Sequence, residues 1–206
     1  MNRAPVTLTV AADQWILNLI PDNASVLDLG CGDGNLLHAL NTLKGVKGRG
    51  VEINEDHVIA CIRKGIPVFQ GNIEEGLKEY GDQSYDIVIL NQTLQTIYHT
   101  EFLLGEMLRV GHRAVVSLPN FAHWRIRLSL GLFGRLPITR LFHYEWYNTP
   151  NIRLVTVNDF KAVCRKMDLR VTGEFYASDN RPIGIFGRCC PNLFSETAVF
   201  VLEKNH

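Results

Sequence analysis

The sequence predicts an α/β fold with a Rossmann-like, doubly wound parallel sheet and helices on both of its faces. Short, continuously apolar runs such as YDIVIL (residues 85–90) alternate with segments of helical periodicity. Strands that are buried on both faces in this way are typical of parallel sheets. A glycine-rich turn, GCGDG (residues 30–34), joins the first apolar run to the helical segment after it. The chain has 206 residues, 46% of them hydrophobic, so we expect a single domain over 1–206 with a sizeable core.

The expected elements follow one another in the order that this fold needs. Apolar runs of strand length predict strands at 25–29, 47–53, 67–70, 85–90, 113–118, 169–176 and 197–202. Between them, helices are predicted at 11–20, 36–43, 55–64, 73–80, 100–110 and from 156 onward. Gly65 is suited to follow the third of these helices, and Thr156 with Asp159 has the spacing of a capping box. The segment at about 120–153 interrupts the alternation and is treated as an insertion.

Composition and charge argue against several kinds of partner. Lys plus Arg and Asp plus Glu each number 21, so no overall field favours nucleic acid or an anionic membrane. No run approaches the roughly 20 apolar residues of a membrane span. The five cysteines lack the spacing of metal ligands. Their odd number, with no apolar leader at the start, predicts reduced thiols in a cytoplasmic protein. We therefore expect no nucleic-acid, membrane or metal partner.

The glycine turn occupies the first strand-to-helix connection, where doubly wound sheets bind ligands. Its pattern is GxGxG, because Asn35 stands where the dinucleotide fingerprint has a third glycine. Asp28 lies two residues before Gly30. A site for a pyrophosphate would gain nothing from a carboxylate so close to it. A carboxylate there suits the ammonium and sulfonium groups of S-adenosylmethionine. The alternative is a tight turn in which Gly30, Gly32 and Gly34 only pack the helix on the strand.

Later strand ends carry groups that suit a nucleoside. Glu52 ends the second strand roughly 20 residues beyond the loop, where an acid can accept hydrogen bonds from ribose hydroxyls. Asn72 follows the third strand and suits an adenine edge, with Ile73 as an apolar surface for the ring. Asn91 and Gln92 end the fourth strand at the same crevice. Each residue alone is ordinary strand-end or turn chemistry; their occurrence at successive strand ends favours a cofactor site.

These motifs resemble those of class I S-adenosylmethionine-dependent methyltransferases. The similarity rests on VLDLGCGDG, GVEI, GNI and YDIVIL, over roughly residues 25–118. It implies a seven-stranded, mostly parallel sheet whose last strand, 197–202, is antiparallel. It also implies the cofactor-binding residues. Asp28, Gly30 and Gly32 would border the methionine end, Glu52 would hold the ribose, Ile53 would flank the adenine, and Asn72 would meet its amino group. Cys31 in the glycine turn, Ile73 and Asn91 complete the expected cofactor-binding residues. The family more often has Asp at the position of Asn72.

Longer runs resemble a narrower family, the methionine-biosynthesis protein MetW family. They are GDGNLL, GNIEEGL, ILNQTLQ, SLPNFAHWRIRLSL and LPITRLFHYEWYNTPNIRLVTVNDF. The last two are distinctive, because a generic methyltransferase does not need them. The resemblance implies an accessory or regulatory partner of homoserine O-acyltransferase that binds S-adenosylmethionine or S-adenosylhomocysteine. It implies cofactor binding more firmly than methyl transfer.

The residues identify no acceptor apparatus for methyl transfer. LNQTLQTIY (residues 90–98) is not the Asn/Asp-Pro-Pro-aromatic run of amine-modifying enzymes. RNA cytosine methylation would need a nucleophilic cysteine in the loops after the fourth or fifth strand, and none lies there. Three histidines, at 99, 123 and 143, are candidate bases, although each can equally be an ordinary surface or helix-end residue. A genuine methyltransferase acting on a small molecule therefore stays open as the alternative function, with its catalytic residues unknown.

The insertion combines arginines with large aromatic residues. Between 123 and 154 lie Arg125, Arg127, Arg135, Arg140, Arg153, Trp124, Phe133, Phe142, Tyr144, Trp146 and Tyr147, with a single acid, Glu145. This mixture is enriched at protein interfaces, so the segment is a candidate docking site for the acyltransferase. The alternatives are a lid over the crevice with its aromatics in the core, and a grip on RNA, which the zero net charge disfavours.

Overall fold

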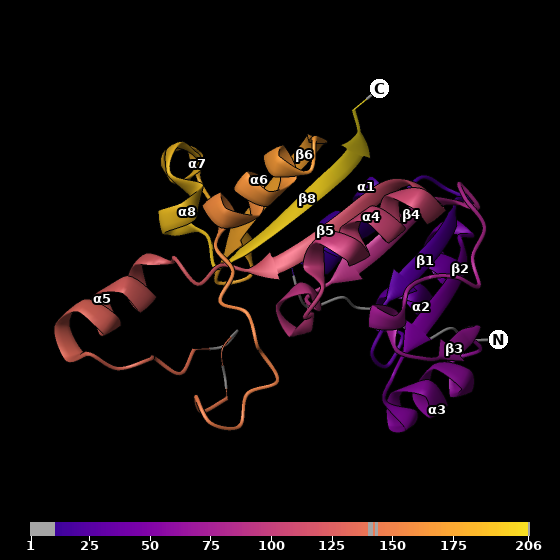
Figure 1. The fold of residues 1–206 in the computed structure, drawn as a ribbon, viewed down its shortest axis with the longest axis horizontal. Helices are drawn as coiled ribbons and strands as arrows, with labels where there is room; N and C mark the ends of the chain where they lie inside the picture. Colours follow the sequence, from indigo (N-terminus) through magenta and orange to yellow (C-terminus); the bar gives the residue numbers. More distant parts are fainter. Residues whose placement is uncertain (1–10, 140–141, 143, 206) are drawn as a thin grey trace.

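Eight strands form the central sheet of the described part of the chain (Figure 1). The computed structural model describes residues 11–139, 142 and 144–205, without the side chain of Phe186. The strands lie in the order β3-β2-β1-β4-β5-β8-β6-β7. Their bounds are β1 Ser25–Leu29, β2 Lys47–Glu52, β3 Val68–Gln70, β4 Tyr85–Asn91, β5 Gly111–Pro119, β6 Leu169–Ser178, β7 Arg181–Pro182 and β8 Thr197–Lys204.

The strands β1 to β5 are parallel, and β8 runs against them. β8 lies between β5 and β6 and pairs antiparallel with both. The expected antiparallel last strand is therefore confirmed. The expected number of seven strands is one too few, because β7 pairs antiparallel with the end of β6 and adds a short edge strand. Two residues offer no apolar run or alternation, so a sequence pattern cannot signal such a strand.

Helices cover both faces of the sheet, as the sequence predicts. On one face lie α1 (Ala11–Leu19), α2 (Asn35–Lys44) and α3 (Glu55–Arg63), and on the other lie α4 (Thr100–Val110) and α6 (Val157–Lys166). The strands supply side chains to both layers in alternation. In β4, Ile87 and Ile89 pack into the cluster under α1 and α2, whereas Val88 and Leu90 pack into the cluster under α4 and α6. Burial on both faces explains the continuous apolar runs.

Local signals place two helix ends correctly and one helix wrongly. Gly65 follows the end of α3 with φ +72°, in the left-handed region. Thr156 caps α6, because its Oγ1 accepts the N–H of Asp159 at 3.1 Å. The predicted helix at 73–80 is wrong: the chain there forms one 3₁₀ turn, η1 (Ile73–Glu75), which ends at Gly76 with φ +92°. A glycine in this conformation terminates the helix after a single turn.

The insertion contains a helix that the sequence analysis missed. α5 (Trp124–Phe133) follows β5, ends at Gly134 and projects from the body on the side away from α2 and α3 (Figure 1). Its sequence, WRIRLSLGLF, alternates apolar with polar or small residues, which is a strand pattern rather than a helical one. The short helices α7 (Ile185–Cys189) and α8 (Pro191–Phe194) are also unpredicted. No helix in the described ranges is long and apolar enough to cross a membrane.

Candidate functional site

The candidate site lies at the carboxyl ends of β1, β2 and β4. The turn after β1 holds three glycines in the left-handed region, Gly30 at φ +68°, Gly32 at φ +55° and Gly34 at φ +76°. Such values favour glycine. The N–H groups of Gly30 and Cys31 both donate to the carbonyl oxygen of Val51, at 2.8 and 3.1 Å. The turn is therefore bonded to β2 through its backbone.

The three glycines face different surroundings. A Cβ on Gly30 would lie 2.8 Å from both Cγ2 and Oγ1 of Thr93, and one on Gly34 would lie 2.8 Å from Sγ of Cys61. Packing thus requires glycine at these two positions. A Cβ on Gly32 would meet no described atom within 4 Å. The packing interpretation of the turn accounts for Gly30 and Gly34, and it leaves Gly32 with an open approach to its backbone.

The side chain of Cys31 packs against β2 and α3. A Cβ on Gly50 of β2 would be too close to Sγ of Cys31. The same Sγ lies 3.9 Å from Sγ of Cys61. Burial raises the pKa of the Cys31 thiol, so the thiol stays protonated at neutral pH. Cys31 thus contributes its backbone to the turn, while its side chain packs against the apolar cluster under α2.

Glu52 braces the glycine turn against β2. The carboxylate is 7% exposed. Its Oε2 accepts the N–H of Gly32 at 2.8 Å, and its Oε1 accepts the N–H groups of Ile53 and Asn54, each at 2.9 Å. A carboxylate offers about four acceptor positions, so these bonds leave roughly one. A ribose hydroxyl that binds Glu52 must therefore share its carboxylate with backbone N–H groups. The sequence did not indicate these backbone bonds.

Asp28 carries a buried carboxyl oxygen that lacks a hydrogen-bond partner among the described residues. The side chain is 2% exposed, and the orphaned atom is Oδ1. Burial, and then the charges of Asp13 and Glu52, raise the pKa of Asp28 to about 8. Asp28 is therefore mostly protonated at pH 7. A buried polar group without a partner costs about 1–3 kcal/mol, which a donor or a cation in the crevice would offset.

A hydrogen-bonded chain connects this region to α1 and β5. Oδ1 of Asp13 accepts from Nδ2 of Asn91 at 2.8 Å, and Oδ1 of Asn91 accepts from the hydroxyl of Ser117. The same hydroxyl accepts the N–H of Gln92 at 2.9 Å. Burial raises the pKa of Asp13, and the bond from Asn91 opposes that rise. The sequence analysis missed Asp13 and Ser117, because an acid in the first turn of a helix and a serine in a strand are both ordinary.

The residues expected at the adenine end are only partly together. Ile53 is 65% exposed next to Glu52, and the N–H of Gly71 donates to the Glu52 carbonyl at 3.0 Å. The end of β3 therefore lies beside the end of β2. Asn72 is exposed and caps η1, its Oδ1 accepting the N–H of Glu74 at 3.0 Å. Ile73, in contrast, packs into the core cluster on the α4 side of the sheet.

The two candidate bases that the structure describes precede different helices. The N–H of His99 donates to Oε1 of Glu74 at 3.0 Å, just before α4. His123 precedes α5 and is buried, and burial lowers the pKa of its imidazole. His143 lies outside the described residues. All five cysteines are free thiols.

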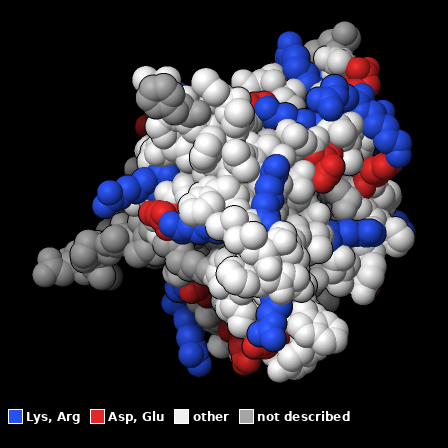
Figure 2. All heavy atoms as spheres, turned by 90° about the vertical axis from the view of Figure 1, so that its left-hand side faces the viewer, with Lys and Arg blue, Asp and Glu red and all other residues white. Residues whose placement is uncertain are grey.

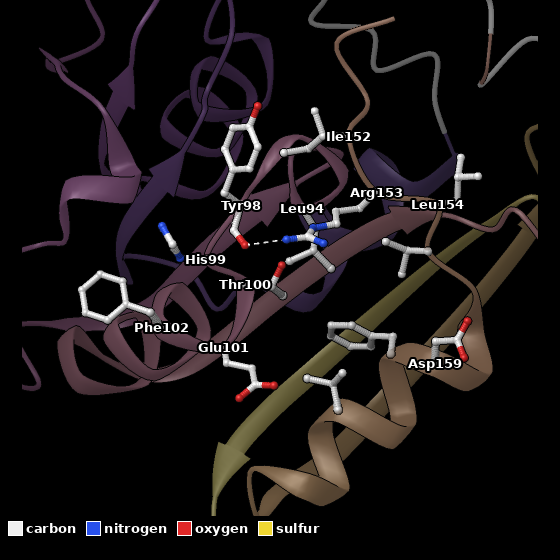
Figure 3. Close-up of a pocket in the computed structure, with 13 residues that line it drawn as sticks. Leu94, Tyr98, His99, Thr100, Glu101, Phe102, Ile152, Arg153, Leu154 and Asp159 are labelled. Carbon is white, nitrogen blue, oxygen red and sulfur yellow. Dashed lines mark hydrogen bonds between the residues drawn. The ribbon is translucent and has the colours of Figure 1, made fainter. Parts of the chain in front are cut away.

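Two cavities lie away from the glycine turn. One of about 840 Å³ separates the start of α4 from α6 and the segment 152–155 (Figure 3). Arg153 reaches across it, and its Nη2 donates to the carbonyl oxygen of Tyr98 at 2.8 Å. The second, of about 480 Å³, shares Leu154 with the first and is lined by Phe142 and Trp146 among others. Both cavities therefore involve the insertion rather than the crevice.

Comparison with known proteins identifies the family. The sequence matches the family described as methionine biosynthesis protein MetW over residues 11–202. The chain belongs to the MetW family. A bifunctional methionine biosynthesis protein MetXA/MetW from Rhodopirellula baltica is 35% identical over 212 residues, which include 98% of this chain and 34% of the relative. This MetW-family chain thus spans about a third of the length of that relative.

Solved structures agree on the fold of this MetW-family chain. An S-adenosylmethionine-dependent methyltransferase from Mesorhizobium loti has a TM-score of 0.67 at 15% identity, covering 94% of this chain and 98% of that one. A TehB-like S-adenosylmethionine-dependent methyltransferase from Corynebacterium glutamicum has a TM-score of 0.64 at 16% identity, covering 97% and 90%. Identities this low show the fold alone, and that fold is the class I methyltransferase fold.

Proposed function

We propose that this MetW-family protein binds S-adenosylmethionine or S-adenosylhomocysteine at the glycine turn. The observation that carries the proposal is the orphaned Oδ1 of Asp28, buried at the end of β1 near a turn whose Gly32 is open. A cationic ligand would supply the missing interaction and favour the ionised carboxylate. The relatedness of the fold to S-adenosylmethionine-dependent methyltransferases supports the same ligand.

The residues at the crevice could each contact a specific part of this ligand. Asp28 would face the cationic methionine end, and Gly32 would let the ligand approach the backbone. The remaining acceptor position of Glu52 would take a ribose hydroxyl, and the exposed face of Ile53 would cover the adenine. When bound, S-adenosylmethionine would supply an activated methyl group. The proposed cofactor-binding residues also include the backbone of Cys31, and Asn72 and Asn91 at the neighbouring strand ends. Ile73 is buried in the core, so it would support the adenine site from beneath.

We further propose that the protein acts in methionine biosynthesis as an accessory or regulatory partner of a homoserine O-acyltransferase. The support is the relative that joins MetXA and MetW in one chain. Two proteins that are covalently joined in one organism often associate when they are separate in another. We place this partnership in the cytoplasm, in keeping with five cysteines that are all free thiols. We propose a single domain over 1–206, with the insertion as its docking part.

The docking segment is taken as residues 123–154. Phe133, Trp146 and Tyr147 are 72%, 74% and 70% exposed, so the alternative that these aromatics fill the core is wrong. Figure 2 views the molecule from the side of α5, where Lys and Arg side chains lie on a largely uncharged surface. Exposed aromatic residues among arginines are typical of interface hot spots. The two cavities that share Leu154 would receive apolar side chains of the partner.

The arginines of this segment are less free than its aromatics. Arg127 Nε donates to the carbonyl oxygen of Ala122 at 2.6 Å, and Arg153 Nη2 donates to that of Tyr98 at 2.8 Å. These bonds tie the segment to the body of the protein. Arg140 lies outside the described residues. We therefore assign the docking energy to Phe133 and Trp146 rather than to Arg127.

One experiment separates this function from its alternative, methyl transfer to a small molecule. The purified protein is incubated with methyl-labelled S-adenosylmethionine and homoserine, its acyl esters or a cell extract, and the acyltransferase is assayed with and without it. We expect saturable cofactor binding, no label transfer and co-purification with the acyltransferase. Sustained label transfer would establish the enzyme instead, and a lack of any cofactor binding would remove the crevice proposal.

A further inference from the structure

A third cavity, of about 250 Å³, lies at the base of α5. Three parts of the chain meet there: the start of α5 after β5, the turn between β6 and β7, and the residue just before β8. They supply His123 and Arg125, Asp179, and Glu196 respectively. None of these side chains belongs to the cofactor crevice.

His123 is the buried polar group of this cavity. The residue is 3% exposed, and it lines the cavity. Its ring packs near that of Trp124, with centroids 5.8 Å apart. A neutral imidazole offers one donor and one acceptor. A buried imidazole that lines a cavity therefore has a donor and an acceptor to offer to a polar ligand.

The contacts of Arg125 with the two carboxylates near His123 are long. Nη1 of Arg125 lies 3.5 Å from Oδ1 of Asp179 and 3.4 Å from Oε1 of Glu196, both at the long limit of a hydrogen bond. Each contact uses the same guanidinium nitrogen, so the flat fork of Arg125 retains donors for a carboxylate. Among the described residues of the lining, two carboxylates accompany one guanidinium, so these side chains also suit an ammonium group.

Asp179 lies in a turn of defined backbone geometry. Asp179 and Asn180 have φ +49° and +58°, and together they form the two-residue turn between Ser178 and Arg181. Left-handed values at both positions of such a turn match the type I′ hairpin. The N–H of Asp179 donates to Oε2 of Glu196 at 2.9 Å. This bond fixes the carboxylate-bearing turn against the start of β8.

We propose that this cavity binds a free α-amino acid with a short apolar side chain. The ligand carboxylate would pair with Arg125, and its ammonium would lie between Asp179, Glu196 and His123. The apolar wall is made by Ile126, Ile138 and Phe142. At about 30 Å³ for each water, 250 Å³ holds roughly eight waters, which is the size of a small amino acid. The proposal does not depend on the cofactor crevice or on the acyltransferase.

The test is calorimetric titration of the full chain with L-norleucine and with two analogues that each lack one charged group. Pentylamine lacks the carboxylate, and hexanoate lacks the ammonium. We expect norleucine to bind about tenfold or more tightly than either analogue, because each charge-assisted contact contributes at least that factor. Arg125→Gln and Asp179→Asn should each weaken norleucine binding about tenfold or more, whereas Arg165→Gln, an exposed arginine on α6, should not.

Three outcomes would overturn the proposal. They are no saturable binding of norleucine to the folded protein, equal binding of norleucine and pentylamine, and equal effects of Arg125→Gln and Arg165→Gln. The Tm of every variant is measured to verify that the variant is folded. Arg125→Lys keeps the charge but loses the fork, so it should bind norleucine less tightly than the parent and more tightly than Arg125→Gln.

Discussion

Replacing Asp28 by Asn should stabilise the protein at alkaline pH and weaken the binding of S-adenosylmethionine. The two side chains have nearly the same shape, and this one is 2% exposed at the end of β1. Asn is neutral at every pH, whereas Asp28 must ionise in a buried place near Asp13 and Glu52. The variant therefore removes a titrating charge from the core and leaves the packing nearly unchanged.

The direction of the stability effect follows from the pKa of Asp28, which is raised to about 8 in the folded protein. The unfolded value is about 3.9, so between about pH 4 and 8 the folded chain keeps a proton that the unfolded chain has lost. The stabilising contribution of the protonated group is complete below the unfolded pKa and disappears as the pH rises through the folded one. The slope is at most about 1.4 kcal/mol per pH unit. From pH 6 to 8 the parent protein should lose about 2 kcal/mol relative to Asp28→Asn, or roughly 4–8 °C in Tm.

Ligand affinity should change in the opposite direction. A charge-assisted contact contributes about 1.5–3 kcal/mol, so Asp28→Asn should weaken S-adenosylmethionine binding by roughly 10- to 150-fold. The parent affinity should rise as the pH passes about 8, because the cationic ligand favours the ionised carboxylate. S-adenosylhomocysteine lacks the sulfonium charge, so its affinity should fall less in the variant.

Thermal unfolding by circular dichroism at pH 6, 7 and 8, with calorimetric titration of both ligands, tests these expectations. Asp56→Asn is the matched control, because Asp56 is exposed on the first turn of α3. Parallel loss of Tm in the parent and in Asp28→Asn over this range would refute the raised pKa. Unchanged affinity for S-adenosylmethionine in the folded variant would remove Asp28 from the proposed site.

Three further variants test the rest of the site and the docking segment. Glu52→Gln should weaken S-adenosylmethionine binding about tenfold by calorimetry and also lower the Tm, because the carboxylate accepts N–H groups of Gly32, Ile53 and Asn54; an unchanged Tm would contradict the bracing role. Gly32→Ala and Gly65→Ala place a Cβ in open space at φ +55° and +72°, so each should cost about 1 kcal/mol of stability, but only the former should lose cofactor affinity. Equal affinities in these two would show that the turn binds nothing. Phe133→Ala combined with Trp146→Ala should weaken acyltransferase binding about thirtyfold in a pull-down titration with little change in Tm, whereas Ile185→Ala, 81% exposed but outside the segment, should not. Loss of cofactor affinity with the partner still bound would instead make the segment a lid.

The alternation of strands and helices could be predicted from the sequence because it depends on local patterns. A strand buried on both faces reads as an apolar run, and a cap such as Thr156 or Gly65 depends on neighbours within a few residues. The pattern failed where local and tertiary preferences disagreed. In α5 an alternating sequence forms a helix, and at Gly76 one left-handed residue ends a predicted helix after one turn.

The sequence by itself determined the family, the order of the main elements and the glycine turn that marks the crevice. Only the tertiary structure decided which distant groups meet there. Asp13 comes near Asp28 from α1, Thr93 lies behind Gly30, and Glu52 is bonded to the turn. Likewise, His123, Asp179 and Glu196 converge only because β8 lies between β5 and β6. The physical reason is that periodicity tells which side of an element is buried, whereas the charge and hydrogen-bonding state of a side chain depend on whichever residues the fold places against it.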